Sequence, residues 1–214
     1  TTADTLLSEG DVDWEAVKRV RVLHVSGVAL SHPPLRDTVV KLMEVVGGSG
    51  GLVSFDPNFR ADVWLGDVER ARREMLQAFE LSSLVTLGRD ELEPLLGVSG
   101  FREAASRLLS LSPSLKYVAV RLGGEGAYVA TSRGEEAYVE AFRVPVVDTT
   151  GAGDAWTAAF IVFHLVEGRG LKDSVLLANA VAAMKCMRRG ATSGMPRRGE
   201  LAEFLRARGL AVPL

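Results

Sequence analysis

The chain of 214 residues contains one cysteine, Cys186, so no disulfide can form within it. A single thiol fits a reducing compartment, and we expect a cytoplasmic protein. No apolar run approaches the length of a membrane-spanning helix, and no secretory signal peptide is visible. The net charge is only −2. This balance offers no basic surface for nucleic acid or an anionic membrane, so we expect neither as a partner.

Several motifs are absent as well. The histidines His24, His32 and His164 do not have the spacing of metal ligands. No Gly-x-Gly-x-x-Gly follows a first strand with an acid about twenty residues later, which excludes a Rossmann-type dehydrogenase. No repeat, low-complexity segment or linker interrupts the chain, which is long enough for a well-buried core. We therefore expect a single domain over residues 1–214.

Apolar strands alternate with amphipathic helices through most of the sequence. The pattern predicts strands near residues 20–26, 52–55, 84–87 and 117–120, a hairpin over 127–142, and a strand-like run at Phe142–Val147. It predicts helices near residues 13–19 (with Asp13 as N-cap), 35–46, 67–79, 89–96 and 101–111, and from Gly151, Leu171 and Arg198. This order predicts an α/β fold with a three-layer α/β/α sheet, mostly parallel, with an antiparallel edge from residues 117 to 147.

The stretch Asp148-Thr149-Thr150-Gly151-Ala152-Gly153-Asp154 opens the longest apolar helical pattern in the chain. Its two glycines allow a tight turn and a close approach to a ligand. The unpaired N–H groups and positive dipole end of a starting helix suit an anion such as phosphate. An acid at that place would repel phosphate unless it serves an acceptor or a metal. On the bare Gly-x-Gly pattern, a capped helix with Asp154 in its first turn explains the residues equally well.

The full seven residues, with the small residues that follow, resemble the second signature of the ribokinase-like (PfkB) sugar kinases. The resemblance implies that Asp154 is the catalytic base, which accepts the proton of a sugar hydroxyl as that hydroxyl attacks the γ-phosphate of ATP. It also implies that the amides of Gly151, Ala152 and Gly153 form an anion hole for the transferring phosphate. Phosphoryl transfer depends mostly on positioning and charge stabilisation, so a weakly basic carboxylate suffices.

Two further stretches resemble the nucleotide site of that family. Arg121-Leu122-Gly123-Gly124-Glu125-Gly126 matches the nucleotide loop, in which a lysine or threonine stands two residues before the first of two glycines. The resemblance implies that Arg121, Gly123 and Gly126 line the ribose and phosphates of ATP, whereas a plain hairpin turn is the alternative. Asn179 resembles a residue of the adenine-site helix, although an asparagine amid alanines is also explained as a helix-packing residue.

The resemblance also implies metal ions. Glu91 stands where the family has Asn-x-x-Glu, with the glutamate acting on Mg²⁺ through water, but Gly88 replaces the asparagine and weakens any nucleotide contact there. A solvated helix face is the alternative for Glu91. Asp148 and Thr150 match positions that bind a monovalent cation, such as K⁺, in many family members. The alternative is that Asp148 only caps the turn.

Asp56-Pro57-Asn58-Phe59-Arg60, followed by Trp64, is the stretch most informative about substrate. It resembles a motif of 2-keto-3-deoxygluconate kinases and bacterial fructokinases, which implies that Asn58 and Arg60 face the substrate. The fork of Arg60 would bind a phosphate or a carboxylate. Residues 23–30 look closer to the first group, so we expect 2-keto-3-deoxygluconate as substrate. Fructokinase and ribokinase-type sugar kinases are the alternatives.

The resemblance covers almost the whole chain from about Ala3, but it does not cover a whole family member. The part expected before Thr1 holds the first strands, the first glycine-rich signature, most sugar-binding residues and a small β lid that often forms the dimer. We therefore expect an N-terminally truncated kinase that is a homodimer when complete and inactive as this fragment. A non-catalytic nucleotide-binding remnant is the other interpretation, against which the intact Gly151–Asp154 turn argues.

Overall fold

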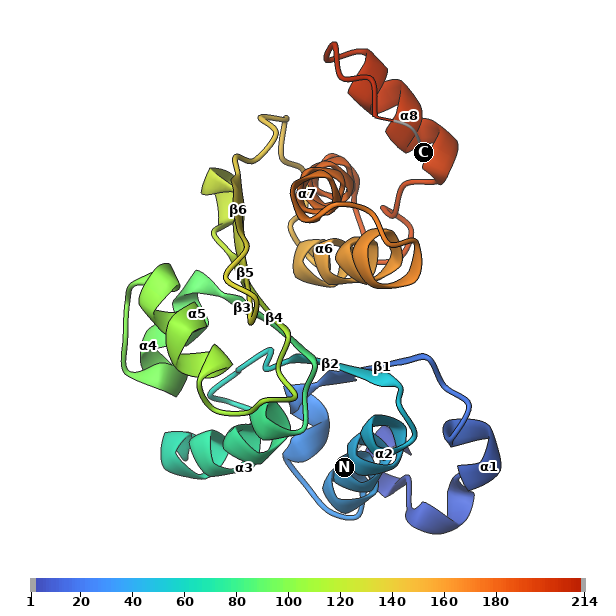
Figure 1. The fold of residues 1–214 in the computed structure, drawn as a ribbon, viewed down its shortest axis with the longest axis vertical. Coiled ribbons are helices and arrows are strands. Elements are labelled where there is room, and N and C mark those ends of the chain that lie inside the picture. The colour runs from blue at the N-terminus through green and yellow to red at the C-terminus, as the bar shows by residue number, and fades with distance from the viewer. Residues whose placement is uncertain (1–2, 213–214) are drawn as a thin grey trace. The chain divides into compact units, whose positions relative to one another are not determined.

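The computed structural model describes residues 3–212 (Figure 1). Its strands are β1 (Val22–Ser26), β2 (Leu52–Asp56), β3 (Leu84–Gly88), β4 (Tyr117–Arg121), β5 (Ala127–Thr131) and β6 (Glu136–Val139). They form one sheet in the order β1-β2-β3-β4-β5-β6. β2 runs parallel to both β1 and β3, and a tight turn joins β5 to β6. The predicted α/β sheet, mostly parallel with an antiparallel edge, is confirmed.

The α-helices also follow the predicted order. They are α1 (Trp14–Val17), α2 (Leu35–Gly48), α3 (Val68–Glu80), α4 (Arg89–Leu96), α5 (Phe101–Leu109), α6 (Ala152–Phe160), α7 (Leu171–Cys186) and α8 (Arg198–Arg206). Four short 3₁₀ turns are η1 (Ala3–Leu6), η2 (Glu9–Asp11), η3 (Gly27–Leu30) and η4 (Gly123–Glu125), and the π-helical η5 (Ile161–Val166) extends α6. Among the described residues, no helix has both the length and the apolar character to cross a membrane.

The chain divides into two compact units. Unit 1 runs to Val120 and also contains Ala130–Glu135, whereas unit 2 contains Arg121–Val129 and the chain from Glu136 onward. Two of the boundaries fall within β4 and β5, and the third lies between β5 and β6. The single domain that the sequence predicts stays a prediction.

The core of unit 1 is built on β2 and β3, whose central residues are buried almost without exception. Strands of a parallel sheet covered by helices read as continuous apolar runs, which is the pattern of these two segments. Helix α2 packs on β1 and β2, and α4 packs on β3. The rings of Phe55 and Phe79 meet edge to face with centroids 5.6 Å apart, which joins α3 to the strands.

In unit 2, α6 lies along α7, and α7 also packs on β6 and α8 (Figure 1). The Trp156 and Phe160 rings of α6 stack with centroids 5.2 Å apart. Helix α7 is buried over most of its length, including the polar side chains of Ser174, Asn179 and Lys185, of which the last two are an amide and an ammonium. Buried polar groups need partners, so these two residues mark places where the helix is tied to its surroundings.

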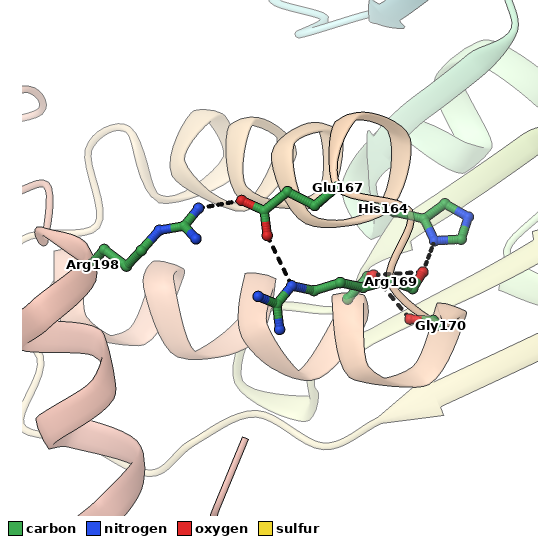
Figure 2. A network of polar contacts seen from close by, with 6 residues as sticks. His164, Glu167, Arg169, Gly170 and Arg198 are labelled. Atoms are coloured by element: carbon green, nitrogen blue, oxygen red, sulfur yellow. Dashed lines mark hydrogen bonds and ion pairs between the residues drawn. The ribbon is translucent and has the colours of Figure 1, made fainter. Parts of the chain in front are cut away.

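A polar network fixes the connection between η5 and α7 (Figure 2). The Glu167 carboxylate accepts hydrogen bonds from Arg169, at 2.9 Å, and from Arg198 at the start of α8. Arg198 and then Arg169 hold the pKa of Glu167 below its usual range. The ring of His164 is 2.8 Å from the Arg169 carbonyl oxygen. The network holds the turn after η5 against α8.

The strand-like run predicted at Phe142–Val147 is wrong, because β6 ends at Val139 and these residues form no strand. Pro145 has no N–H to give to a ladder. Val146 and Val147 are 64% and 62% exposed, so their β-branched side chains do not report a buried strand. The amides of Val147 and Asp148 instead donate to the carbonyl of Cys186, which leads the chain to the end of α7.

We predict that Gly27→Ala destabilises the protein. A Cβ on Gly27 would lie 2.2 Å from the carbonyl oxygen of Pro57, and backbone cannot move away as a flexible side chain can. We expect a loss of about 1–3 kcal/mol in the free energy of unfolding, measured by urea denaturation. The control is Gly48→Ala at the end of α2, where an added Cβ meets nothing within 4 Å. Equal stabilities of the two variants would contradict the packing described at Gly27.

Candidate active site

The turn before α6 lies in unit 2 and has the geometry of an anion site. Gly151 caps the helix with φ 78° and ψ 7°, a left-handed conformation that favours glycine. The Ala152 amide donates to the Thr149 carbonyl at 3.0 Å and so closes the turn. Within the described residues, the amides of Gly151 and Gly153 have no backbone partner. Of the three predicted anion-hole amides, two are therefore open and one is already engaged.

Asp154 is exposed in the first turn of α6. Its carboxylate forms no hydrogen bond or ion pair with any residue that the structure describes. A proton acceptor for an incoming hydroxyl must be both reachable and unengaged. Asp154 meets both conditions.

The guanidinium of Arg121 lies against the same turn. Its Nη1 donates to the Thr157 hydroxyl at 2.9 Å and approaches the Gly153 carbonyl at 3.4 Å. A Cβ on Gly153 would come within 3.3 Å of the Arg121 guanidinium carbon, so glycine leaves room for the side chain. The structure thus brings two predicted parts of the site together, and it fixes a positive charge beside the amides of the turn.

The predicted nucleotide loop is also a tight turn in its own right. The Leu122 amide donates to the Gly126 carbonyl at 2.8 Å, and the Gly126 amide donates to Gly123 at 3.1 Å. Gly123 and Gly126 have φ values of 59° and 114°. A Cβ on Gly126 would lie 2.0 Å from the Val139 carbonyl oxygen, so strand packing alone demands glycine there. The glycines are explained by the hairpin alternative, and their nucleotide role stays a prediction.

Asp148 organises the backbone behind the anion turn. Its Oδ1 accepts from the Thr150 amide at 2.9 Å, and its Oδ2 accepts from the Gly190 amide at 2.8 Å. These two hydrogen bonds, with Thr150 the larger cause, hold the pKa of Asp148 well below its usual range. Asp148 therefore caps the turn, as the alternative interpretation expects.

Lys185, which the sequence analysis missed, completes this cluster. Its ammonium donates to the Asp148 carbonyl at 2.7 Å and lies 3.8 Å from Asp148 Oδ2. The side chain is fully buried. The available signal was a charged residue inside an apolar helical run, residues 180–186, because a buried lysine requires a partner.

Asn179 is 5% exposed, and its amide is fully engaged. Its Oδ1 accepts from Trp156 Nε1 at 2.7 Å, while its Nδ2 donates to the carbonyls of Val139 and Glu140 at 2.9 and 3.1 Å. Both amide hydrogens are used, so the residue ties α7 to α6 and to the end of β6. These contacts match the packing alternative, and the adenine-site role stays a prediction.

In unit 1, the end of β2 carries the candidate substrate residues. The carboxylate of Asp56 accepts from the Asn58 amide and from the Thr86 hydroxyl, both at 3.2 Å. Asn58 adopts φ 41°, and its side-chain amide lies 3.4 Å from the Ser26 hydroxyl. Arg60 Nε lies 3.4 Å from the Asn58 side-chain oxygen. The structure therefore brings Asn58 and Arg60 together, at the carboxyl ends of β1 and β2.

Glu91 supports this loop from α4. Its Oε1 accepts from the Phe59 amide at 2.6 Å, and its Oε2 accepts from the Gly88 amide at 2.5 Å. The side chain is 6% exposed, so the solvated helix face considered as an alternative is wrong. Glu91 fixes the backbone between Asn58 and Arg60. Its predicted action on Mg²⁺ is a further role that these contacts do not test.

A family profile and similar known proteins point to the same family of carbohydrate kinases. The profile of the pfkB family carbohydrate kinases matches residues 1–198. Fructokinase-1 of Zea mays is 31% identical over 211 residues, which are 95% of this chain and 64% of the relative. The chain therefore spans less than two thirds of the length of such curated relatives.

Solved structures of similar fold include two with bound nucleotide. A candidate ribokinase II of Escherichia coli, solved with ATP and Mg²⁺, has a TM-score of 0.84 and 30% identity over 94% of this chain and 63% of its own. A double mutant of fructokinase from Vibrio cholerae O395, solved with fructose, ADP and potassium ion, has a TM-score of 0.84 and 28% identity over 95% and 66%. On the profile match and on these similarities, the chain belongs to the pfkB family of carbohydrate kinases.

Proposed function

We propose that the complete protein is an ATP-dependent kinase that phosphorylates a hydroxyl of a small sugar or keto-sugar acid. The observation that carries the proposal is the exposed and unengaged carboxylate of Asp154, beside open amides and the Arg121 guanidinium. Family membership and the nucleotides named in the similar structures support the same reaction class. The fructokinases among the relatives support a sugar as acceptor.

In the proposed reaction, Asp154 orients the acceptor hydroxyl and takes its proton late in the transfer. The acceptor oxygen forms a bond to the γ-phosphorus of ATP while the bond to the β,γ-bridging oxygen breaks and ADP leaves. The open amides of Gly151 and Gly153 stabilise the charge on the transferring group, and Arg121 adds a fixed positive charge. The Asp154 carboxylate thus contacts the acceptor hydroxyl, whereas the amides and Arg121 contact the transferring phosphate. For this reason the acid does not oppose phosphate binding.

Magnesium would accompany ATP and neutralise part of the phosphate charge. Among the described residues, no group of three or more His, Cys, Asp or Glu side chains could hold a metal ion. Both oxygens of Glu91 already accept backbone hydrogen bonds. A carboxylate held by backbone amides in this way fits an indirect contact through water better than direct coordination. We therefore keep Glu91 as the proposed Mg²⁺ residue in that indirect form.

Two acceptors remain in competition, and each has its own support. Named fructokinases among the relatives favour fructose. The Asn58-Phe59-Arg60 loop favours 2-keto-3-deoxygluconate, because the terminal nitrogens of Arg60 form no hydrogen bond or ion pair with a described residue and an arginine fork matches a carboxylate. Homodimer formation by the complete protein and a cytoplasmic location stay predictions.

We predict that Asp154→Asn in the full-length protein lowers kcat by about 10²–10⁴-fold while ATP affinity changes little. The amide keeps the shape but cannot accept the hydroxyl proton at neutral pH. A coupled ADP-release assay gives kcat, and calorimetric titration gives the affinity for ATP. The control is Asp173→Asn, an exposed acid in the first turn of α7, which should behave as wild type. Retained turnover in Asp154→Asn would remove this residue from the base role.

The acceptor is identified by measuring kcat/KM of the full-length protein for fructose, 2-keto-3-deoxygluconate, ribose and adenosine, and the highest value marks the preferred acceptor. If the acceptor carries a carboxylate, we expect Arg60→Ala to raise its KM by about tenfold or more, since hydrogen bonds to charged groups are worth about 1.5–3 kcal/mol. The KM for fructose should then stay within about twofold. Arg73→Ala, at an exposed arginine of α3, is the control.

The same measurements separate the rival interpretations. Turnover of adenosine or ribose alone would reject both preferred acceptors. ATP binding without turnover of any acceptor by the full-length protein would instead support a nucleotide-binding remnant.

A further inference from the structure

The groups that would bind a monovalent cation already have a cation beside them. The expected ligands are oxygens of Asp148 and Thr150. In this structure the Lys185 ammonium donates to the backbone carbonyl of Asp148 at 2.7 Å and lies 3.8 Å from its Oδ2. An ammonium group carries the same single charge as K⁺ and is of similar size. Lys185 thus supplies, as part of a side chain, the positive charge that a potassium ion from solution would otherwise supply.

The burial of Lys185 makes this arrangement a fixed one. The side chain is fully buried, and the Asp148 side chain is 23% exposed. A buried ammonium is tolerated only when it is paired and hydrogen-bonded. Asp148 supplies both a carbonyl and a carboxylate, and two backbone amides keep that carboxylate ionised. A potassium ion at the same oxygens would be repelled by the ammonium, so these residues do not fit K⁺.

The ammonium is also coupled to the anion turn. Asp148 is bonded through its carboxylate to the amides of Thr150 and Gly190. The residue after Gly190, Ala191, packs on Gly151, where an added Cβ would come within 3.2 Å. One connected cluster therefore runs from the Lys185 ammonium to the helix cap that precedes the open amides. All of its members belong to unit 2.

We propose that Lys185 takes the place of the monovalent cation, so that this protein needs no potassium to order its anion turn. Lys185 is a positioning residue in this role, because it acts through Asp148 and touches no reacting atom. The proposal rests on the proposed kinase function for its effect on rate. Its effect on the stability of the turn is independent of that function.

The first test uses the wild-type full-length protein in potassium, sodium and choline chloride at equal ionic strength, about 0.1 M. We expect the kcat and the melting temperature to be the same in all three salts. Activation or thermal stabilisation specific to K⁺ would overturn the proposal. This measurement decides the matter even if a variant fails to fold.

The second test is Lys185→Met, which removes the charge and retains an unbranched apolar stem. In choline we expect kcat to fall by about 10–100-fold, the usual range for residues that orient a site's ligands. Potassium, but not choline, should restore part of the rate and raise the melting temperature, since an ion that binds only the folded state stabilises it. The control is Lys172→Met, at an exposed lysine of α7, which should show no salt-specific effect.

Two results of the variant experiment would contradict the proposal. One is a Lys185→Met protein with wild-type rate and stability in every salt. The other is a folded variant whose rate and melting temperature are lower but equal in potassium and choline, which would make Lys185 a packing residue only. If the full-length wild type shows no kinase activity, the proposed function fails, while the salt-specific melting of Lys185→Met still tests the cation role.

Discussion

The contact between the Lys185 ammonium and Asp148 is the constraint on which the candidate catalytic turn depends. Asp148 holds two backbone amides with its carboxylate and the buried ammonium with its carbonyl. Removing either partner would leave an unpaired charge beside the turn, which is far more costly than the net value of the pair. The turn can therefore keep the amides of Gly151 and Gly153 without a described backbone partner, because Asp148 holds the backbone on its other side.

The acids of the candidate site divide according to their partners. Asp148 and Glu91 each accept two backbone N–H bonds, and each fixes a loop, one in either unit. Of the two, Asp148 is a poor base, because the hydrogen bonds from the Thr150 and Gly190 amides hold its pKa well below its usual range. Asp154 is exposed and bonds to none of the described residues. This difference in hydrogen bonding is a physical reason to assign the proton-accepting role to Asp154 and a structural role to Asp148 and Glu91.

Local sequence patterns predicted the helices and the parallel strands because each depends on residues near in the chain. Asp13 and Asp67 cap α1 and α3 with their side chains, and Gly97 ends α4 in a left-handed conformation. The strand prediction for Phe142–Val147 is wrong because β-branched residues form a strand only beside a partner strand. In addition, Pro145 lacks the N–H group that a strand ladder needs. A motif likewise named Asp154, but whether its carboxylate is engaged depends on the folded chain.

The distant partners of Glu91, Asn179 and Lys185 could not be predicted, since they lie between 23 and 40 residues away in the chain. A motif predicted that Glu91 acts on a metal ion, but it could not reveal that the Glu91 carboxylate accepts a hydrogen bond from the Phe59 amide. Lys185 belonged to no motif at all. Its signal was energetic, because a lysine in an apolar helix implies a buried partner whose identity only the fold supplies.

A tethered cation changes how the anion turn responds to its surroundings. A site that binds a free ion is occupied according to the ion's concentration, and the stabilisation grows as RT ln(1 + [L]/Kd). Lys185 is always present, so its contribution has no such dependence. Its partner is equally constant, because the lowered pKa of Asp148 keeps the carboxylate ionised from neutral pH to below its ordinary titration range. Stability from this group is therefore present above the unfolded pKa of aspartate and is lost only as the pH falls through the lower folded value. The cluster thus holds the anion turn in one conformation over the neutral pH range and at any potassium concentration.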